Sequence, residues 1–208
     1  GGDPRFRIGI EDQPLVGKWK ATDKRLLPSS IGMSLLKEAQ SVKKNFDGPS
    51  PSRKYLAAVL TEIALNKLSV LDRELSRSNE KIDGRYFPHV ITVSSGSNGK
   101  ELNYLVEDAS SRLFDLTSLL FGLTEVRTIM QPRILSELGF EESKLEAYRK
   151  QTLNLLNDVL HSIKSKHLGA GDKILGEVSL ESDDASSANT ANLGLLIVGL
   201  HRVLQVEG

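Results

Sequence analysis

The sequence predicts a mainly α-helical protein, a bundle of about five helices that carries an extended N-terminal arm. Three observations support this fold class. Apolar residues recur at the 3.6-residue period of a helix over five long stretches of the chain. Proline and glycine separate these stretches, as they do at helix ends. No sequence repeat of roughly 20 to 50 residues is present, which argues against a solenoid.

The chain is long enough to form one sizeable domain. It has 208 residues, of which 39% are apolar and 26% are charged, close to the usage of ordinary globular proteins. We therefore expect one helical domain over residues 29–208, preceded by an arm over residues 1–28. The arm contains frequent glycine and proline breaks and one alternating run, residues 5–10, that predicts a strand. Because the chain begins with Gly-Gly-Asp, we also expect a processed product or a fragment of a larger protein.

Five apolar stripes set the expected helices. Their ranges are 30–45, 51–84, 102–130, 141–167 and 185–206. Ser50 and Pro51 suit the N-cap and the first turn of the second helix, which has an alternative end between Ser76 and Asn79. The third helix is apolar on more than one side, so we expect it to be central and buried. Residues 169–184 predict a loop of weak strand character.

The segment VITVSSGSNGKEL, residues 90–102, contains parts of two catalytic motifs and completes neither. A phosphate-binding loop needs a glycine where Ser94 stands and a hydroxyl where Glu101 stands. A nucleophile elbow of the form G-x-S-x-G would expose Ser97, but Ser95 replaces its first glycine. No series of alternating strands and helices surrounds the segment to build the sheet that an elbow needs. A serine hydrolase that uses Ser97 is therefore the weakest of the functional alternatives.

The same segment has two structural interpretations. Asn98-Gly99 is the preferred pair for a two-residue hairpin turn near residues 88–106. That turn would pair Val93 with Tyr104, and Ile91 with Val106. Alternatively, Asn98 caps a helix and Glu101 closes a capping box. We favour the helix, because an apolar stripe continues from Leu102, and the hairpin stays open.

Charge and cysteine content argue against several function classes. Lysine and arginine total 27, as do aspartate and glutamate, so the net charge is zero and nucleic acid is disfavoured as the principal partner. The chain contains no cysteine, which excludes disulfides and a cysteine nucleophile. The four histidines show no metal-binding spacing, and we expect no metal and no cofactor. No apolar run approaches the roughly 20 residues of a membrane span. A cytoplasmic location is weakly favoured.

Two regions contain candidate binding residues. In the arm, a basic segment surrounds the only tryptophan, which either contacts a partner's side chain or a base, or folds back over the helical core. Its residues are Lys18, Trp19, Lys20, Lys24 and Arg25. In the last helix, Gly194 and Gly199 predict a close helix contact, within this domain or with a second chain. We expect Ile197 to face inward there.

These patterns predict a non-enzymatic protein–protein interaction or assembly module, acting as a scaffold or as a homo-oligomeric structural subunit. The expectation of a non-enzyme follows from the lack of any complete catalytic motif in the sequence. The alternative is a nucleic-acid-associated helical coat or nucleoprotein-like subunit, in which the basic arm and lysines of neighbouring subunits form a groove.

Overall fold

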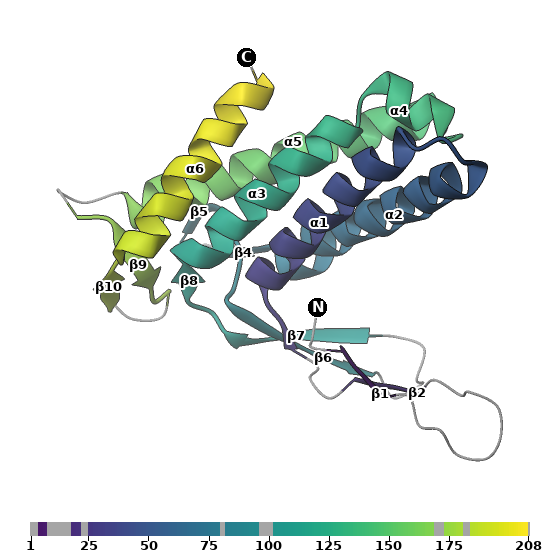
Figure 1. The fold of residues 1–208 in the computed structure, drawn as a ribbon. Helices are drawn as coiled ribbons and strands as arrows, with labels where there is room; N and C mark the ends of the chain where they lie inside the picture. The colour runs from purple at the N-terminus through teal and green to yellow at the C-terminus, as the bar shows by residue number, and fades with distance from the viewer. Residues whose placement is uncertain are drawn as a thin grey trace.

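The computed structural model describes residues 4–7, 18–21, 25–79, 82–95, 102–168, 173–180 and 184–207. It confirms the mainly α fold class, because six α-helices and two short π-helical segments make up most of the described residues. Short antiparallel sheets lie mostly toward the end of the bundle where α1, α3 and α6 begin (Figure 1).

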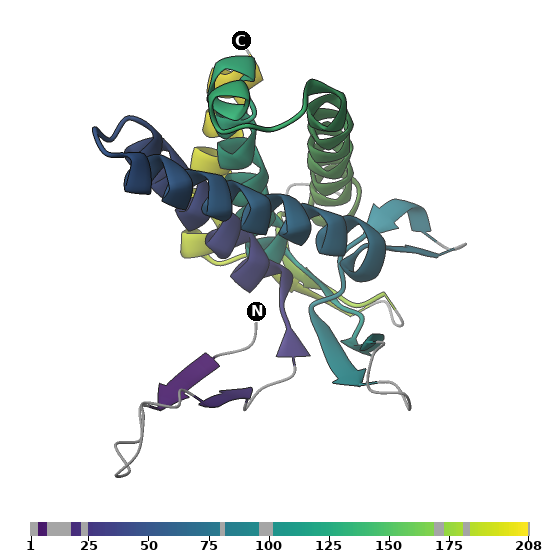
Figure 2. The same cartoon turned by 90° about the vertical axis from the view of Figure 1, so that its right-hand side faces the viewer.

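Four helices form a layer, and a fifth packs against it. α6, α3, α1 and α2 lie side by side in that order, and α5 packs on α3 (Figure 1, Figure 2). The short α4 connects α3 to α5, and the π-helical segments η1 and η2 extend α2 and α5. The bounds are α1 Pro28–Phe46, α2 Pro51–Val70, η1 Leu71–Leu75, α3 Leu113–Ile129, α4 Pro132–Glu137, α5 Glu142–Ser162, η2 Ile163–His167 and α6 Thr190–Glu207.

Helix α3 is the centre of the core, and nearly all of its side chains are buried. It crosses α1 so closely that the two backbones touch. A Cβ at Gly32 of α1 would overlap the backbone of Ser118, and a Cβ at Gly122 of α3 would overlap the carbonyl of Gly32. Leucines from several helices belong to the same buried core. They include Leu35, Leu68, Leu116, Leu120 and Leu156.

The segment that begins at Val90 forms a hairpin. β6 (Val90–Ser95) pairs antiparallel with β7 (Leu102–Asp108), and β3 (Arg25–Leu26) pairs with the other edge of β6. The register is the one that the Asn98-Gly99 turn predicts, with Val93 opposite Tyr104 and Ile91 opposite Val106. The turn itself, residues 96–101, lies outside the described residues, and so does Ser97.

The favoured helix interpretation of this segment is wrong, because α3 begins only at Leu113. The apolar residues of β7 suggested one helical stripe. In the structure, Leu102 and Leu105 are exposed, while Ile91 of the partner strand is buried in the core. Cross-strand pairing satisfies the backbone of β7 and therefore overrides the short-range apolar period.

The second helix ends at the earlier of its two expected positions. α2 and η1 run to Leu75, and Ser76 has an extended backbone. β4 (Arg77–Asn79) then pairs antiparallel with β5 (Ile82–Tyr86), and Gly84 within β5 has a φ of 82°. Ser50 lies at the N-cap of α2 as predicted, but its side chain forms no capping hydrogen bond.

The last helix is shorter than predicted. β8 (Ser111–Arg112), β9 (Leu175–Val178) and β10 (Ala185–Ser187) form an antiparallel sheet with β9 in the middle. Because β10 pairs with β9, α6 begins at Thr190 and not at residue 185. β9 lies within residues 169–184, the segment predicted to be a loop of weak strand character. In the arm, β1 (Pro4–Arg7) pairs with β2 (Lys18–Ala21), so a strand includes the first part of the predicted run.

Candidate interaction surfaces and polar clusters

The structure describes four of the five candidate binding residues of the arm. Lys18, Trp19 and Lys20 lie on β2, where the backbone of Trp19 is paired with that of Phe6 on β1. Lys24 lies outside the described residues. A partner-binding role for this segment stays a prediction.

Arg25 belongs to a different sheet from the other arm candidates. It lies on β3, opposite Thr92 of β6. Its guanidinium is 3.9 Å from the carboxylate of Glu107 on β7, and both side chains are about half exposed. An exposed pair of this kind contributes at most about 1 kcal/mol. Strand pairing with β6 places the backbone of Arg25 in this sheet.

The inward face of α6 packs on α3. Leu196 and Val203 are buried there. A Cβ at Gly199 would lie 3.0 Å from Cδ2 of Leu120 and 3.6 Å from the methyl carbon of Thr117. The close approach at Gly199 is therefore made within the chain.

The outer face of α6 is apolar and open to solvent. Ile197 and Leu204 are 68% and 72% exposed, so the expectation that Ile197 faces inward is wrong. Gly194 lies on this face, with no neighbouring atom within 4 Å of the Cβ that it lacks. None of the described residues exposed on this face is a lysine, arginine, aspartate or glutamate, but Arg202, whose side chain is 34% exposed, lies one turn after Val198. Its exposed residues are Thr190, Ala191, Gly194, Leu195, Ile197, Val198, His201, Leu204 and Gln205.

A second apolar stripe lies on α2, at the opposite edge of the helical layer (Figure 1). We call it the outer face of α2, and it consists of Tyr55, Leu56, Val59 and Ile63, all exposed. Exposed charges border this stripe, because Glu62 and Lys54 lie on the same helix, whereas the charge beside the outer face of α6, Arg202, is paired with Glu125.

A buried carboxylate joins three helices of the layer. Glu125 of α3 forms ion pairs with Lys43 of α1 and with Arg202 of α6, the second at 3.4 Å. The Arg202 guanidinium also lies 5.8 Å from the ring centre of Phe121. Because both cations keep access to water, they compensate the buried charge without being fully desolvated. This cluster fixes α6 on α3 and leaves its outer face uncovered.

A second buried carboxylate links two helix N-termini. Asp115, in the first turn of α3, accepts the backbone N–H of Ser29 in the first turn of α1 at 3.2 Å. Its other oxygen is 2.6 Å from Nδ1 of His89. The positive ends of both helices favour a carboxylate here. No serine hydroxyl in the described part of the chain is bonded to His89, so the Asp115–His89 pair forms no catalytic triad with a serine of that part.

The segment η2 buries two further titratable groups. The His167 ring bonds on both sides, with Nδ1 2.7 Å from the Leu175 carbonyl and Nε2 3.0 Å from Oγ of Ser111. Burial lowers the pKa of His167, and the charge of Lys166 acts in the same direction. The Lys166 ammonium lies 5.5 Å from the ring centre of Tyr86 and has no hydrogen-bond partner among the described residues. Burial lowers its pKa to about 8.

Comparisons with protein-family models, with curated proteins and with solved structures find no match. Within the described ranges, no helix combines the length and the apolar character that crossing a membrane would require. The same residues contain no group of three or more histidine, aspartate or glutamate side chains suited to hold a metal ion. The exposed surfaces and polar clusters of the chain are therefore the features that bear on its function.

The outer face of α6 was only partly visible in the sequence. Gly194 was identified from its residue type, whereas Ile197 and Leu204 were not identified as exposed. The available signal was an excess of apolar residues: α6 has more of them than one inward stripe can hold.

Proposed function

We propose that this chain is a non-catalytic assembly subunit that associates with further copies of itself through the outer face of α6. The observation that carries the proposal is an exposed, uncharged apolar face on a helix whose other face is already packed. Contiguous exposed apolar surface of this kind is typical of protein interaction sites. A second copy supplies the same face, so one two-fold contact would cover both.

Gly194 supports a contact between two helices. A glycine inside a helix costs about 1 kcal/mol relative to alanine. At Gly194 no packing against the described residues offsets this cost, because none of their atoms beyond the local helix backbone lies within 4 Å of the missing Cβ. Ala191, nearly one turn earlier, is also small and exposed. A second helix could approach closely at these positions and cover Ile197 and Val198 of both copies.

The charge pattern favours α6 over α2 as the surface between identical copies. In a two-fold contact through α2, Glu62 of each copy would approach its own equivalent or lose solvent. The charged residue beside the outer face of α6, Arg202, is already paired within the chain with Glu125 at 3.4 Å. A helix of 18 residues is about 27 Å long, so α6 alone supplies less than the roughly 800 Å² per partner of a standard interface. We therefore expect weak association, in about the micromolar range.

The test is sedimentation equilibrium over protein concentrations from about 1 to 300 µM, a range set by that affinity. The wild-type mass should rise above that of a single 22.8 kDa chain. The double variant Ile197→Glu, Leu204→Glu should stay monomeric, because it places two charges on the contact and leaves the core unchanged. Tyr55→Glu, an equally exposed position on α2, is the matched control and should associate like the wild type.

Two results would contradict this proposal. A wild-type protein that stays monomeric at the highest concentration would remove self-association altogether. Loss of association in Tyr55→Glu, with normal association of the α6 double variant, would transfer the contact to the outer face of α2.

A further inference from the structure

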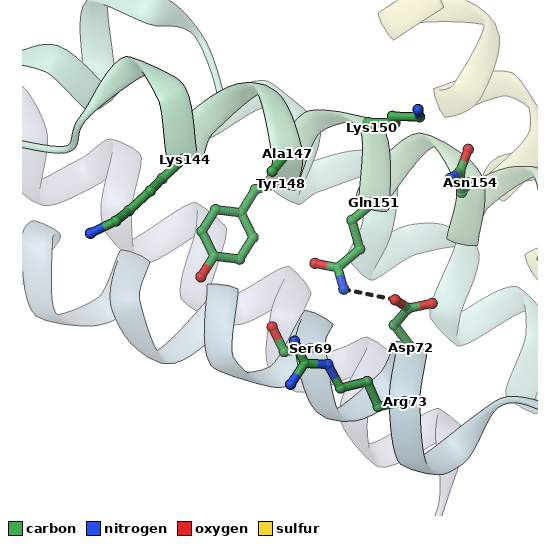
Figure 3. Close-up of a pocket in the computed structure, with 9 residues that line it drawn as sticks. All are labelled: Ser69, Asp72, Arg73, Lys144, Ala147, Tyr148, Lys150, Gln151 and Asn154. Atoms are coloured by element: carbon green, nitrogen blue, oxygen red, sulfur yellow. Dashed lines mark hydrogen bonds between the residues drawn. The ribbon is translucent and has the colours of Figure 1, made fainter.

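A groove between α2 and α5 collects hydrogen-bond donors. It lies beside η1 and has a volume of about 580 Å³, within the range of small-molecule sites. Figure 3 shows Tyr148 and Gln151 reaching from α5 toward α2, while Arg73 lies beside Ser69 on the facing side. Lys144 stands at one end of the groove (Figure 3).

The carboxylate in the groove, Asp72, is already fully engaged. One of its oxygens accepts a hydrogen bond from Arg85 at 2.6 Å, and the other accepts one from Gln151 at 2.9 Å. Burial raises the pKa of Asp72, but the bonds from Gln151 and Arg85 outweigh burial and hold the pKa below its ordinary value. Arg85 comes from β5, outside the groove lining, so the ion pair of Asp72 does not use a lining cation, although the nearby charge of Arg73 also lowers the pKa of Asp72.

Two of the three lining cations have hydrogen-bond donors that no described residue uses. In the described part of the chain, Arg73 and Lys150 form no ion pair and no side-chain hydrogen bond, and the Tyr148 hydroxyl has no hydrogen-bond partner. Lys144 has one exposed partner, the Glu141 carboxylate at 3.4 Å. The lining thus has three cations and one carboxylate, Asp72, which is paired from outside with Arg85, a residue that also contacts Asp158 at 3.4 Å.

We propose that this groove binds the phosphate group of a small phosphate-bearing molecule, held by Arg73, Lys144 and Tyr148. Phosphate offers several acceptor oxygens and matches the planar fork of an arginine. A carboxylate would leave part of this donor set unused. The volume of the groove suits a ligand of about mononucleotide size. This site is independent of the proposed assembly function, because neither outer face contributes to it.

The test is a titration of ¹⁵N-labelled protein at low ionic strength with inorganic phosphate, pyrophosphate and adenosine monophosphate, followed by amide chemical shifts. Saturable shifts should centre on α2 and α5 around the groove. Arg73→Ala should weaken binding by about tenfold or more, and Tyr148→Phe, which keeps the ring, by about threefold. Arg53→Ala, on the same helix about 30 Å away, is the matched control and should bind normally.

Three outcomes would overturn the site. They are the absence of saturable shifts with all three probes, an equal loss of binding in Arg53→Ala, and unchanged binding in both groove variants. If Arg73→Ala fails to fold, Arg73→Lys and Tyr148→Phe decide the question. Binding of a single-stranded oligonucleotide more than about tenfold tighter than that of the mononucleotide would overturn the small-molecule assignment and favour a nucleic-acid surface.

Discussion

At the scale of single residues, glycines have opposite roles in two helices. Gly32 lets the α1 and α3 backbones touch, whereas Gly194 lies open to solvent. Gly32→Ala should therefore lower the free energy of unfolding by about 2 kcal/mol or more, because overpacking outweighs the gain in helix propensity. Gly194→Ala should raise it by about 0.5 to 1 kcal/mol in dilute protein. Urea unfolding measures both. Equal stability of the two variants would contradict the backbone contact at Gly32.

Lys166 should make stability depend on pH in the alkaline range. Its pKa is about 8 in the folded protein against an ordinary value of 10.5, so the unfolded chain holds the proton more tightly. Between these pH values the folded protein loses the proton first, and its free energy of unfolding rises with pH. At pH 7 the variant Lys166→Met should be more stable than the wild type, since it removes a buried charge.

The measurement for Lys166 is urea unfolding of wild type and variant at pH 7, 8, 9 and 10, a series chosen to span that alkaline window. The advantage of Lys166→Met should shrink steadily as pH rises. Lys164→Met, at an exposed position on the same segment, provides the control and should show no such trend. A stability difference for Lys166→Met that stays constant with pH would refute the role assigned to this ammonium.

At the scale of elements, the sequence predicted the long helices correctly but several of their ends incorrectly. The start of the second helix at Pro51 is confirmed. Helix α1 begins at Pro28, which the sequence placed in the arm, and the short α4, which begins at Pro132, was not predicted. The element after Asn98-Gly99 was misjudged because Leu102 and Leu105 fit a helical stripe as well as a strand. Over a short apolar run the two periods are hard to separate, and β6, the partner that decides between them, is not local information.

The sequence of α6 alone does not show which of its faces is buried. Periodicity shows which residues share a helix face, but α6 is apolar on both faces, so it does not show which face is covered. Packing against Leu120 of α3 and the ion pair between Arg202 and Glu125 decide this. Both contacts join residues distant in the chain. For this reason Ile197 was assigned to the wrong side.

At the scale of the whole molecule, the fold leaves an apolar face at each edge of a helical layer, one on α6 and one on α2 (Figure 1). The net charge of zero gives copies of the chain little overall repulsion. Contact between like faces would form closed dimers, whereas contact between unlike faces would form rings or open filaments. The uncharged outer face of α6 favours the closed dimer.

Association through the outer face of α6 should depend little on salt concentration. Burial of an uncharged face involves little ion release, so the dissociation constant should change by less than about threefold between 50 and 500 mM sodium chloride. A nucleic-acid coat subunit would behave differently, because each neutralised phosphate releases counterions and the affinity for RNA falls steeply with salt. Sedimentation equilibrium at the two salt concentrations, with a labelled oligonucleotide titrated in parallel at low salt, separates the two functions. Strong salt-sensitive RNA binding without self-association would reverse the proposed assignment. Salt-insensitive self-association lost in the α6 double variant would support it.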